Sequence, residues 1–494
     1  MWGIPNKEFR ILLICFLLAN GGILFILNAV YWDDWTLINT DPKLIEKNFA
    51  DAGSFLNLGY YIHYYLLQLG PWFYKILTLL MNFFSGIFVF RILARNEWMC
   101  KFEKLLITLF FMISPLFIAK VVMIDFPYSF GLFIFLLAWL LIRRIRILSL
   151  TLFFLSFCLL PSLLVFYSLP ILDYYFLEQK TLTPSQVFKW AVTKIDFIIL
   201  PFIQFLVKVR YFAPSELYSG YNENFNPVNF IQSFTGFTSD LFSLDVNFVL
   251  LVLCVIGALL LVPKNLTESD EKKTSINLLY LALLVLFVGY FPYGILGYSP
   301  QFIDWNSRHQ VLLQLGVALL IIVVITNKQV DAKLYLLAFF IGICLSVNIK
   351  NYFDLFLDWN KQKQIMAIMH SSNEVRNASA IVFHDHTMNR NALNRTYRDY
   401  EWNGMMKRVY GDERRYGMND GIAHLEYTSG RSDRFFTLSY NAGTHKRDST
   451  NQVTNVDIFL ERGIRYYFLI NGQKVYGDYS VSSSFYKTVN MLVP

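Results

Sequence analysis

The chain has 494 residues, of which 55% are hydrophobic and only 16% are charged, and its formal net charge is +7. A soluble globular domain has about 25% charged residues, so this composition excludes an ordinary soluble protein and indicates a helical membrane protein with many spans. The positive charge lies mainly after residue 360. No module of stacked aromatic and basic residues accompanies it, so we expect no nucleic-acid partner.

Apolar runs predict eleven spans. The first covers residues 11–30, which is too long for the apolar part of a cleavable signal peptide, so we expect it to remain as an anchor. The other ten are expected at about 72–92, 105–119, 127–142, 148–161, 163–177, 195–210, 246–262, 276–292, 309–326 and 333–349.

Lys and Arg in the short loops predict the orientation, because cytoplasmic loops carry more of them. Seventeen lie in the loops on the side of the N-terminus and six on the other side, namely Lys43, Lys47, Lys120, Lys208, Arg210 and Arg308. The N-terminus is therefore expected in the cytoplasm. The odd number of spans then places residues 351–494, as a separate domain, on the outer, periplasmic face.

An acidic pair, Asp33 and Asp34, follows the first span within Tyr31-Trp32-Asp33-Asp34-Trp35. Carboxylates at the membrane boundary are costly to desolvate, which makes them a functional-site hypothesis. The alternative is a solvated loop in which Trp32 and Trp35 act as interfacial anchors. After this loop, residues 42–52 and 55–69 are expected to form interfacial helices; a true span at 55–69 would move the C-terminal domain inside.

Further polar residues are expected on the same outer face: Lys120, Asp125, Lys208, Arg210, Arg308 and His309. Lys and Arg bind phosphate, so this face suits a lipid phosphate whose sugar packs against aromatic rings. Two simpler interpretations remain open. For Lys120, the simpler interpretation is an ion pair with Asp125. For Lys208 and Arg210, it is that their aliphatic parts lie along the lipid while their charged groups reach water.

A carboxylate on this face could act as a general base. A sugar hydroxyl is a poor nucleophile until its proton is removed, whereas a phosphate leaving group needs cations rather than a general acid. One carboxylate with Lys and Arg therefore suffices for direct displacement at a sugar carbon, unlike the pair of carboxyl groups in a hydrolase.

The C-terminal domain, residues 351–494, is expected to be α/β or α+β. Residues 361–377 resemble a helix, and strands are expected at 380–384, 435–440, 456–460 and 465–471, with Asn471-Gly472 as a hairpin turn. The run His384-Asp385-His386 lacks a third metal ligand and is interpreted as a loop or strand end. Residues 400–415 are interpreted as a solvated helix or, alternatively, as a glycan contact surface.

The order of these motifs resembles that of the GT-C glycosyltransferases, polytopic enzymes that use lipid-phosphate sugar donors. The resembling segments are 31–35 (YWDDW), 58–95, 114–129 (SPLFIAKVVMIDFPYS) and 306–320 (NSRHQVLLQLGVALL), which lie within residues 11–320. Within this group, the length, the motif Asp33-Asp34-Trp35 and the long outer C-terminal domain most resemble bacterial and phage O-antigen-modifying glucosyltransferases.

The resemblance implies a protein of the bacterial inner membrane. It implies inverting transfer of a hexose, glucose in the nearest group, from a polyprenyl-phosphate donor to a lipid-linked O-antigen or surface glycan on the periplasmic face. Asp33 or Asp34 would be the base, and the other outer-face residues would bind substrate. We predict no metal site and assign no definite cofactor, and the use of a divalent cation stays open. The alternatives are a flippase of lipid-linked sugars and an O-antigen polymerase or ligase.

Overall fold

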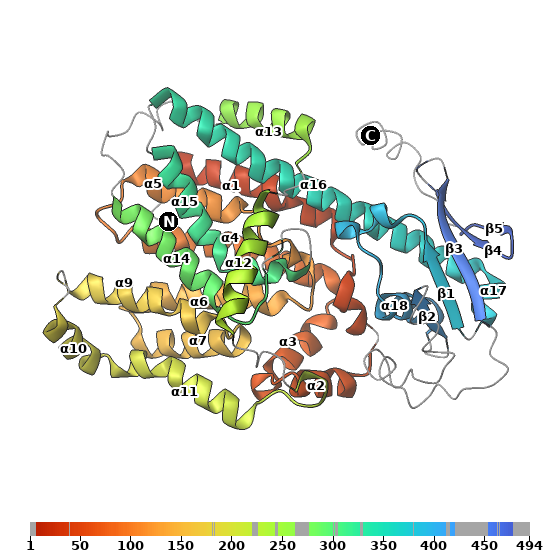
Figure 1. The fold of residues 1–494 in the computed structure, drawn as a ribbon, viewed down its shortest axis with the longest axis horizontal. Coiled ribbons are helices and arrows are strands. Elements are labelled where there is room, and N and C mark those ends of the chain that lie inside the picture. The colour runs from red at the N-terminus through yellow and green to blue at the C-terminus, as the bar shows by residue number, and fades with distance from the viewer. Residues whose placement is uncertain are drawn as a thin grey trace. The chain divides into compact units, whose positions relative to one another are not determined.

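The structure of the protein is a computed structural model that describes residues 6–477 apart from 39, 180, 182, 220–225, 243–245, 262–275, 300, 302–304, 327–329, 379, 412–414, 420–452, 462 and 464. The described chain is mainly α-helical and carries a small C-terminal sheet (Figure 1). Its internal contacts define two compact units. The helical unit comprises Met1–Leu27 and Pro42–Asn351, and the C-terminal unit comprises Asn28–Asp41 and Tyr352–Pro494.

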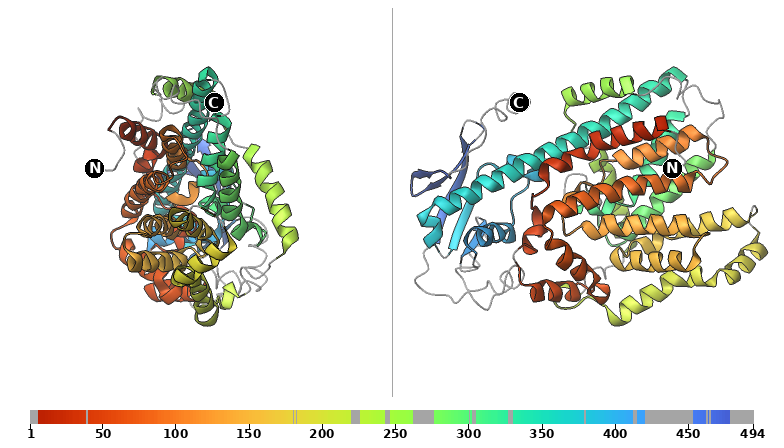
Figure 2. Two further views of the ribbon diagram at one scale, coloured as in Figure 1. Left: turned by 90° about the vertical axis from the view of Figure 1, so that its left-hand side faces the viewer. Right: turned by 180° about the vertical axis from the view of Figure 1, so that it is seen from behind.

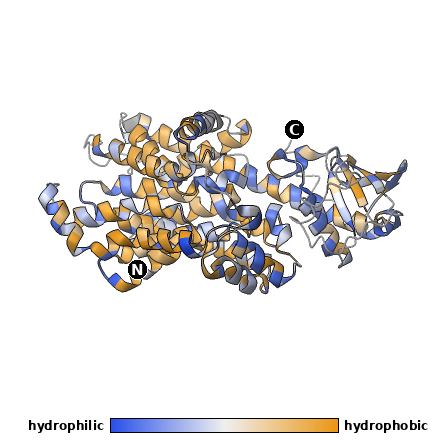
Figure 3. Cartoon of the chain, turned by 60° about the horizontal axis from the view of Figure 1, so that its bottom comes forward, coloured by the Kyte–Doolittle hydropathy of each residue, from blue (hydrophilic) through white to orange (hydrophobic). Residues whose placement is uncertain are grey.

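The helical unit contains most of the apolar sequence, and its helices are predominantly hydrophobic in Figure 3. Its α-helices are α1 (Asn6–Asn20), α2 (Pro42–Asp51), α3 (Leu58–Leu67), α4 (Pro71–Leu93), α5 (Lys101–Ile113), α6 (Phe126–Leu141), α7 (Arg146–Leu159), α8 (Leu163–Phe166), α9 (Ser168–Glu178), α10 (Pro184–Thr193), α11 (Ile195–Tyr211), α12 (Pro227–Phe242), α13 (Phe248–Leu261), α14 (Ile276–Gly294), α15 (Leu313–Thr326) and the first half of α16 (Val330–Ser371). Short 3₁₀ helices lie at η1 (Gly21–Ile26), η3 (Phe55–Asn57), η4 (Ile118–Val121), η5 (Glu216–Tyr218) and η7 (Trp305–Gln310).

Four described helices are long and apolar enough to cross a membrane: Glu8–Ile26, Pro71–Leu93, Ile276–Gly294 and Ala332–Ser371. Helices α10 and α11 together make a fifth candidate, bent by 70°. Helices α6, α7, α13 and α15 are apolar but have only 14 to 16 residues. At 1.5 Å per residue they reach roughly 21–24 Å, less than the hydrocarbon core of about 30 Å. The protein therefore has the apolar helices of a membrane protein, but the predicted count of eleven spans is not confirmed.

Helix α4 packs against both α5 and α6 in the helical unit. Helix α4 begins where Gly70 adopts φ +89° and Pro71 occupies the first turn, positions that suit these two residues. In the same helix, a Cβ at Gly86 would lie 2.2 Å from Cγ of Met112 on α5. A glycine there lets the two backbones approach closely, and a larger side chain would force them apart.

Helix α16 is a single 42-residue helix. The sequence instead predicted a span at 333–349 and a separate helix at 361–377, because the residues change from apolar to polar near 350. Neither proline nor glycine occurs between Gly342 and the end of the helix at Ser371, so no helix-breaking residue ends the helix at that change. The apolar first half belongs to the helical unit, where α13 runs beside it in both figures of the fold (Figures 1 and 2). The second half belongs to the C-terminal unit.

The C-terminal unit contains a five-stranded sheet of order β2-β1-β3-β4-β5. The strands are β1 (Ala380–Asp385), β2 (Tyr416–Asn419), β3 (Val453–Glu461), β4 (Arg465–Ile470) and β5 (Gln473–Val475), and the helices are α17 (Asn373–Asn377) and α18 (Asp399–Tyr410), with 3₁₀ turns η2 (Trp32–Thr36), η8 (Met388–Arg390) and η9 (Ala392–Asn394). Strand β1 is parallel to β2 and β3, and β3, β4 and β5 are antiparallel.

Most of the expected strands are present. Residues 380–384 lie in β1, residues 456–460 lie in β3 and residues 465–470 form β4, while 435–440 lies outside the described residues. The turn at Asn471-Gly472 joins β4 to β5 with φ of +50° and +79°. Two successive positive φ angles define the turn that matches strand twist, which is why Asn-Gly predicted it.

Candidate functional site

The acidic pair lies in a segment of the C-terminal unit, Asn28–Asp41, which we call the acidic loop. Its residues 32–36 form the turn η2, and Trp32 adopts φ +50°, a conformation that is uncommon for a bulky residue. Asp34 is fully buried, and its side chain accepts a hydrogen bond of 3.5 Å from the backbone N–H of Tyr31. Its carbonyl oxygen accepts from the N–H groups of Leu37 and Ile38. Asp34 therefore holds the turn together.

Residues from the other end of the chain hold this loop in place. The indole N–H of Trp35 donates to Oε1 of Gln362 at 3.2 Å, and the Tyr31 hydroxyl donates to the carbonyl oxygen of Leu355 at 2.8 Å, both on α16. Trp35 is fully buried against Gly404 of α18, where a Cβ would come within 2.7 Å of it. The two tryptophans were predicted as site residues. For Trp35, the alternative of an interfacial membrane anchor is wrong, because protein encloses its side chain.

Asp33 is only half-buried and contacts α18 instead. The Tyr400 side chain is hydrogen-bonded to the Asp33 side chain. Burial, the negative charges of Asp33 and Glu401 and this hydrogen bond raise the pKa of Tyr400 above its usual range. Tyr400 therefore stays protonated and donates to the Asp33 carboxylate. Of the two acids, Asp33 is the one whose side chain is partly open to water.

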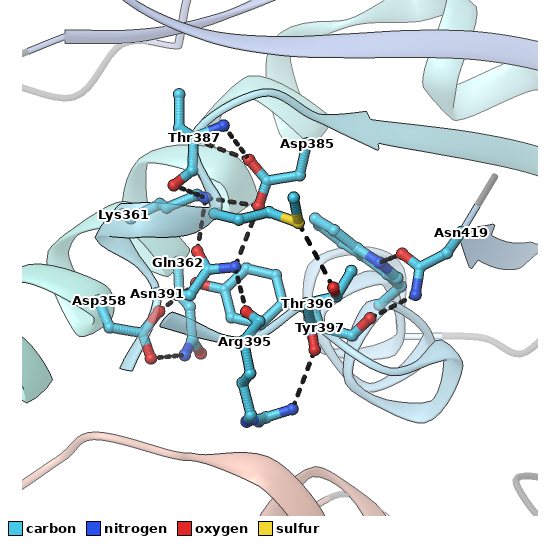
Figure 4. A network of polar contacts seen from close by, with 12 residues as sticks. Asp358, Lys361, Gln362, Asp385, Thr387, Asn391, Arg395, Thr396, Tyr397 and Asn419 are labelled. Atoms are coloured by element: carbon cyan, nitrogen blue, oxygen red, sulfur yellow. Dashed lines mark hydrogen bonds and ion pairs between the residues drawn. The ribbon is translucent and has the colours of Figure 1, made fainter. Parts of the chain in front are cut away.

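The C-terminal unit also contains a network of polar side chains around Lys361 and Asp385 (Figure 4). The ammonium group of Lys361 donates to Oδ2 of Asp385 and Oδ1 of Asn391, each at 2.6 Å, and to the carbonyl oxygen of Thr387 at 3.1 Å. Burial would raise the pKa of Asp385, but the charge of Lys361 and the hydrogen bonds from Lys361 and Thr387 outweigh it and lower this pKa. Asp385 is thus the ion-pair partner of Lys361. The described residues contain no group of three His, Cys, Asp or Glu side chains that could hold a metal ion.

Helix α18 differs from the solvated helix that its charges predicted. Glu401, Trp402 and Met405 are almost completely buried, and Trp402 stacks on Phe383 of β1 with ring centroids 4.2 Å apart. The alternating charges of residues 400–415 predicted a helix exposed to solvent. That prediction failed because Trp402, Met405 and Met406 give the helix an apolar stripe that it buries.

A second polar cluster lies inside the helical unit, where η4 and η7 pack together. The backbone N–H of Ala119 donates to Oγ of Ser307 at 3.0 Å, which joins the two turns. The guanidinium of Arg308 forms an ion pair with the buried carboxylate of Asp125 at 3.6 Å. Lys120 is buried, and its ammonium group donates to Oδ1 of Asn20 at 2.6 Å rather than serving as the ion-pair partner of Asp125. Burial lowers the pKa of Lys120 to about 8.

His309 completes this cluster, which we call the basic cluster (Asn20, Lys120, Asp125, Ser307, Arg308 and His309). Its ring stacks on Tyr293 with centroids 4.7 Å apart, and burial and then Arg308 lower the pKa of His309 to about 3. The imidazole is therefore neutral. Its Nε2 faces the N–H of Arg308 at 3.5 Å and acts as acceptor, which assigns the hydrogen to Nδ1. Within the described part of the chain, this buried Nδ1 has no hydrogen-bond partner.

The predicted site residues thus form separate groups. Asp33, Asp34, Trp32 and Trp35 belong to the C-terminal unit, whereas Lys120, Asp125, Arg308 and His309 come together in the helical unit. Lys208 is half-buried and Arg210 is exposed near the end of α11, and the described residues show no contact between either side chain and the basic cluster. Asp304, four positions before Arg308 in the sequence, lies outside the described residues.

Several contact residues were not predicted. Asn20, Gln362, Tyr400 and Glu401 carry no motif, and their partners lie far away in the sequence. Only Glu401 had a usable local signal, because it occupies the third helical position of α18, where a glutamate accepts from the backbone N–H at the helix start.

Comparison of the chain with protein-family models, with curated proteins and with solved structures found no match.

Proposed function

We propose that the protein is a membrane glycosyltransferase that moves a hexose from a polyprenyl-phosphate donor to a lipid-linked glycan. The observation that carries the proposal is the basic cluster, which places the buried Asp125 and Lys120 and the partly buried Arg308 within an apolar helical unit. Burying such groups is costly unless they are paired or serve a ligand. A phosphate carried by a lipid tail would supply the matching negative charge.

The basic cluster suits a phosphate leaving group. Arg308 presents a planar fork of N–H donors, Lys120 gains its full charge when an anion approaches, and the Nδ1–H of the neutral His309 is an additional donor. In the proposed reaction, the acceptor hydroxyl attacks the anomeric carbon and gives its proton to an aspartate of the acidic loop. The bond from that carbon to the phosphate oxygen breaks, and the phosphate leaves with the electron pair. Direct displacement of this kind inverts the configuration at the anomeric carbon.

The acidic loop supports the same interpretation. Asp34 is buried and holds the turn, while Asp33 is partly open and held by Tyr400, which suits a base of defined orientation. The resemblance to GT-C enzymes, and to O-antigen-modifying glucosyltransferases in particular, suggests glucose as the sugar and O-antigen or lipopolysaccharide as the acceptor. It also suggests the periplasmic face of the bacterial inner membrane as the place of reaction.

A flippase of lipid-linked sugars is the main alternative. It would require ionisable side chains within the spans, and Lys75 in α4 is buried. Its ammonium group, however, donates to the backbone carbonyl of Val121 in η4, where it stabilises the turn that carries Lys120. This contact gives Lys75 a structural role and favours the enzyme.

The test uses the purified full-length protein in lipid nanodiscs with radiolabelled undecaprenyl-phosphate-glucose and a lipid-linked O-antigen acceptor. We expect transfer by the wild-type protein and a loss of about 10²–10⁴-fold in the Asp33→Asn variant, the size of a general-base contribution. Full transfer by the Asp33→Asn, Asp34→Asn double variant would refute the mechanism and favour the flippase.

A further inference from the structure

We propose that Tyr400 and Glu401, neighbours in the first turn of α18, are positioning residues for the acidic loop. The inference rests on the proposed function, in which this loop supplies the base. It gives the C-terminal unit a task in the reaction: it holds the backbone and one carboxylate of the acidic pair.

Glu401 holds the backbone of the loop. Its Oε1 accepts from the N–H of Trp32 at 3.2 Å and from Nη2 of Arg395 at 2.6 Å. Its Oε2 accepts from Nη1 of Arg395 at 2.7 Å and from the N–H of Arg398 at 2.8 Å. The carboxylate is almost completely buried, so its charge depends on Arg395. The ion pair with Arg395 therefore fixes Oε1 of Glu401 as the acceptor for the backbone N–H of Trp32, the residue before Asp33.

The bond to Trp32 is placed where the loop is least stable by itself. Trp32 has φ +50°, a left-handed conformation that persists in a bulky residue only when the surroundings impose it. Glu401 provides one such contact, and the burial of Trp35 against Gly404 provides another. Without them, the backbone would relax and redirect the Asp33 side chain.

Tyr400 acts on the carboxylate itself. A donor hydroxyl stabilises the ionised form of Asp33 and limits its rotation, both of which favour proton acceptance in one direction. Among the described residues, the charged groups that act on Tyr400 are Asp33 of the loop, Glu401 of α18 and Arg395. None of these residues belongs to the basic cluster, so loss of Tyr400 or Glu401 should leave donor binding unchanged.

The experiment compares Tyr400→Phe and Glu401→Gln with Tyr410→Phe in the full-length protein in nanodiscs. Tyr410 is the matched control, because it lies in the same helix and its hydroxyl donates to the carbonyl oxygen of Met369. We measure kcat, the KM for undecaprenyl-phosphate-glucose, the pH profile of kcat, and hydrogen exchange at the amides of Asp34, Leu37 and Ile38, which close the turn.

Both test variants should lower kcat by about 10- to 100-fold with an unchanged donor KM, and Glu401→Gln should speed exchange in the loop. Tyr400→Phe should also move the acidic limb of the pH profile upward by about one to two pH units, because a hydrogen bond to the charged carboxylate is lost. Tyr410→Phe should leave kcat, the exchange rates in the loop and the pH profile unchanged. Because Glu401→Gln also weakens a buried ion pair, Tyr400→Phe tests the inference even if that variant fails to fold.

Unchanged kcat, pH profile and exchange in both test variants would overturn the positioning role. An acidic limb that shifts equally in Tyr410→Phe would also overturn it, because the effect would then be general. A wild-type protein without transfer activity would instead overturn the proposed function, and the exchange rates would still decide whether Tyr400 and Glu401 hold the loop.

Discussion

At the scale of single residues, the ion pair between Asp125 and Arg308 contributes to the packing of the helical unit, and the proposed function gives Arg308 a second role in binding the donor phosphate. Removing one partner of a buried pair leaves the other charge without compensation, which costs more than removing both. A double-mutant cycle separates the two roles, because stability would depend on the pair whereas the proposed donor binding would depend on Arg308 alone.

We predict that Arg308→Gln and Asp125→Asn each lower the thermal unfolding midpoint, and that the double variant is less destabilised than the sum of the two. A coupling of about 0.5–3 kcal/mol is expected for groups in contact. Both variants without Arg308 should lose about 10- to 150-fold in kcat/KM for the donor, since a hydrogen bond to a charged group contributes about 1.5–3 kcal/mol. Strict additivity with unchanged donor use would contradict this assignment.

Lys120 should make stability depend on pH. Burial lowers the pKa of Lys120 to about 8, whereas a lysine in an unfolded chain titrates near 10.4. Between about pH 8 and 10 the unfolded state binds more protons than the folded state, so stability rises with pH across this window. Below about pH 8 both states are protonated and the full destabilisation is present.

The measurement compares unfolding midpoints of the wild-type protein and Lys120→Met in detergent at pH 7, 9 and 10. Relative to the variant, the wild-type protein should gain stability as the pH rises, by at most roughly 3 kcal/mol. Lys120→Met lacks the titrating group but keeps a side chain of similar length. A difference that stays constant from pH 7 to 10 would show that the ammonium group is not desolvated.

At the scale of elements, the close approach of α18 to η2 determines where the acidic loop lies. A Cβ at position 404 would lie 2.7 Å from Cβ of Trp35, an atom next to the backbone that has little freedom to move. Gly404→Ala should therefore displace Trp35 and cost about 1–3 kcal/mol of stability, although alanine is the better helix former by about 1 kcal/mol.

The matched control is Gly257→Ala in α13, where a Cβ would have no neighbour within 4 Å. That variant should be neutral or slightly more stable. Unfolding midpoints, together with the fluorescence of buried tryptophan, distinguish the two. If Gly404→Ala were as stable as Gly257→Ala, η2 would be able to move away from α18 and accommodate the added methyl group at little cost in stability.

Local sequence signals predicted the elements well where a backbone rule applied. Pro71 and Phe126-Pro127 mark the starts of α4 and α6, and Asn471-Gly472 marks the β4–β5 turn. The length of α16 was missed because a change in polarity near residue 350 resembles a boundary, although no residue there breaks a helix. Polarity determines which surface a helix contacts, whereas glycine and proline more often determine where it ends.

Part of the candidate site could also be predicted, because loop charge placed Asp125 and Arg308 on one face and the structure pairs them. The partners of the acidic loop could not. Trp35 and Gln362 are 327 positions apart, and neither belongs to a repeating pattern that would indicate the other. Contacts of this kind depend on the tertiary fold, which single-sequence periodicity does not encode.

For the whole molecule, the distribution of Lys and Arg predicts that the C-terminal unit is periplasmic and the N-terminus cytoplasmic. Alkaline phosphatase fused after Pro494 should therefore be active in the producing bacterium, and a fluorescent protein at the same position should be dark. The same reporters fused after Arg144, in a loop assigned to the cytoplasm, should show the opposite pattern. Reversed signals at both positions would place the acidic loop on the cytoplasmic side and refute the proposed acceptor.

The C-terminal unit is assembled from two pieces of chain, Asn28–Asp41 and Tyr352–Pro494, with Pro42–Asn351 between them. A ribosome that adds about 5–20 residues per second needs roughly 15–60 s to make the intervening chain. During that time the acidic loop has been synthesised, but Gln362, Glu401 and Gly404 do not yet exist. The tryptophan and the carboxylate that the folded loop buries therefore stay without these partners until residues 362–404 have been translated, and during this interval the loop is open to proteolysis and chaperone binding.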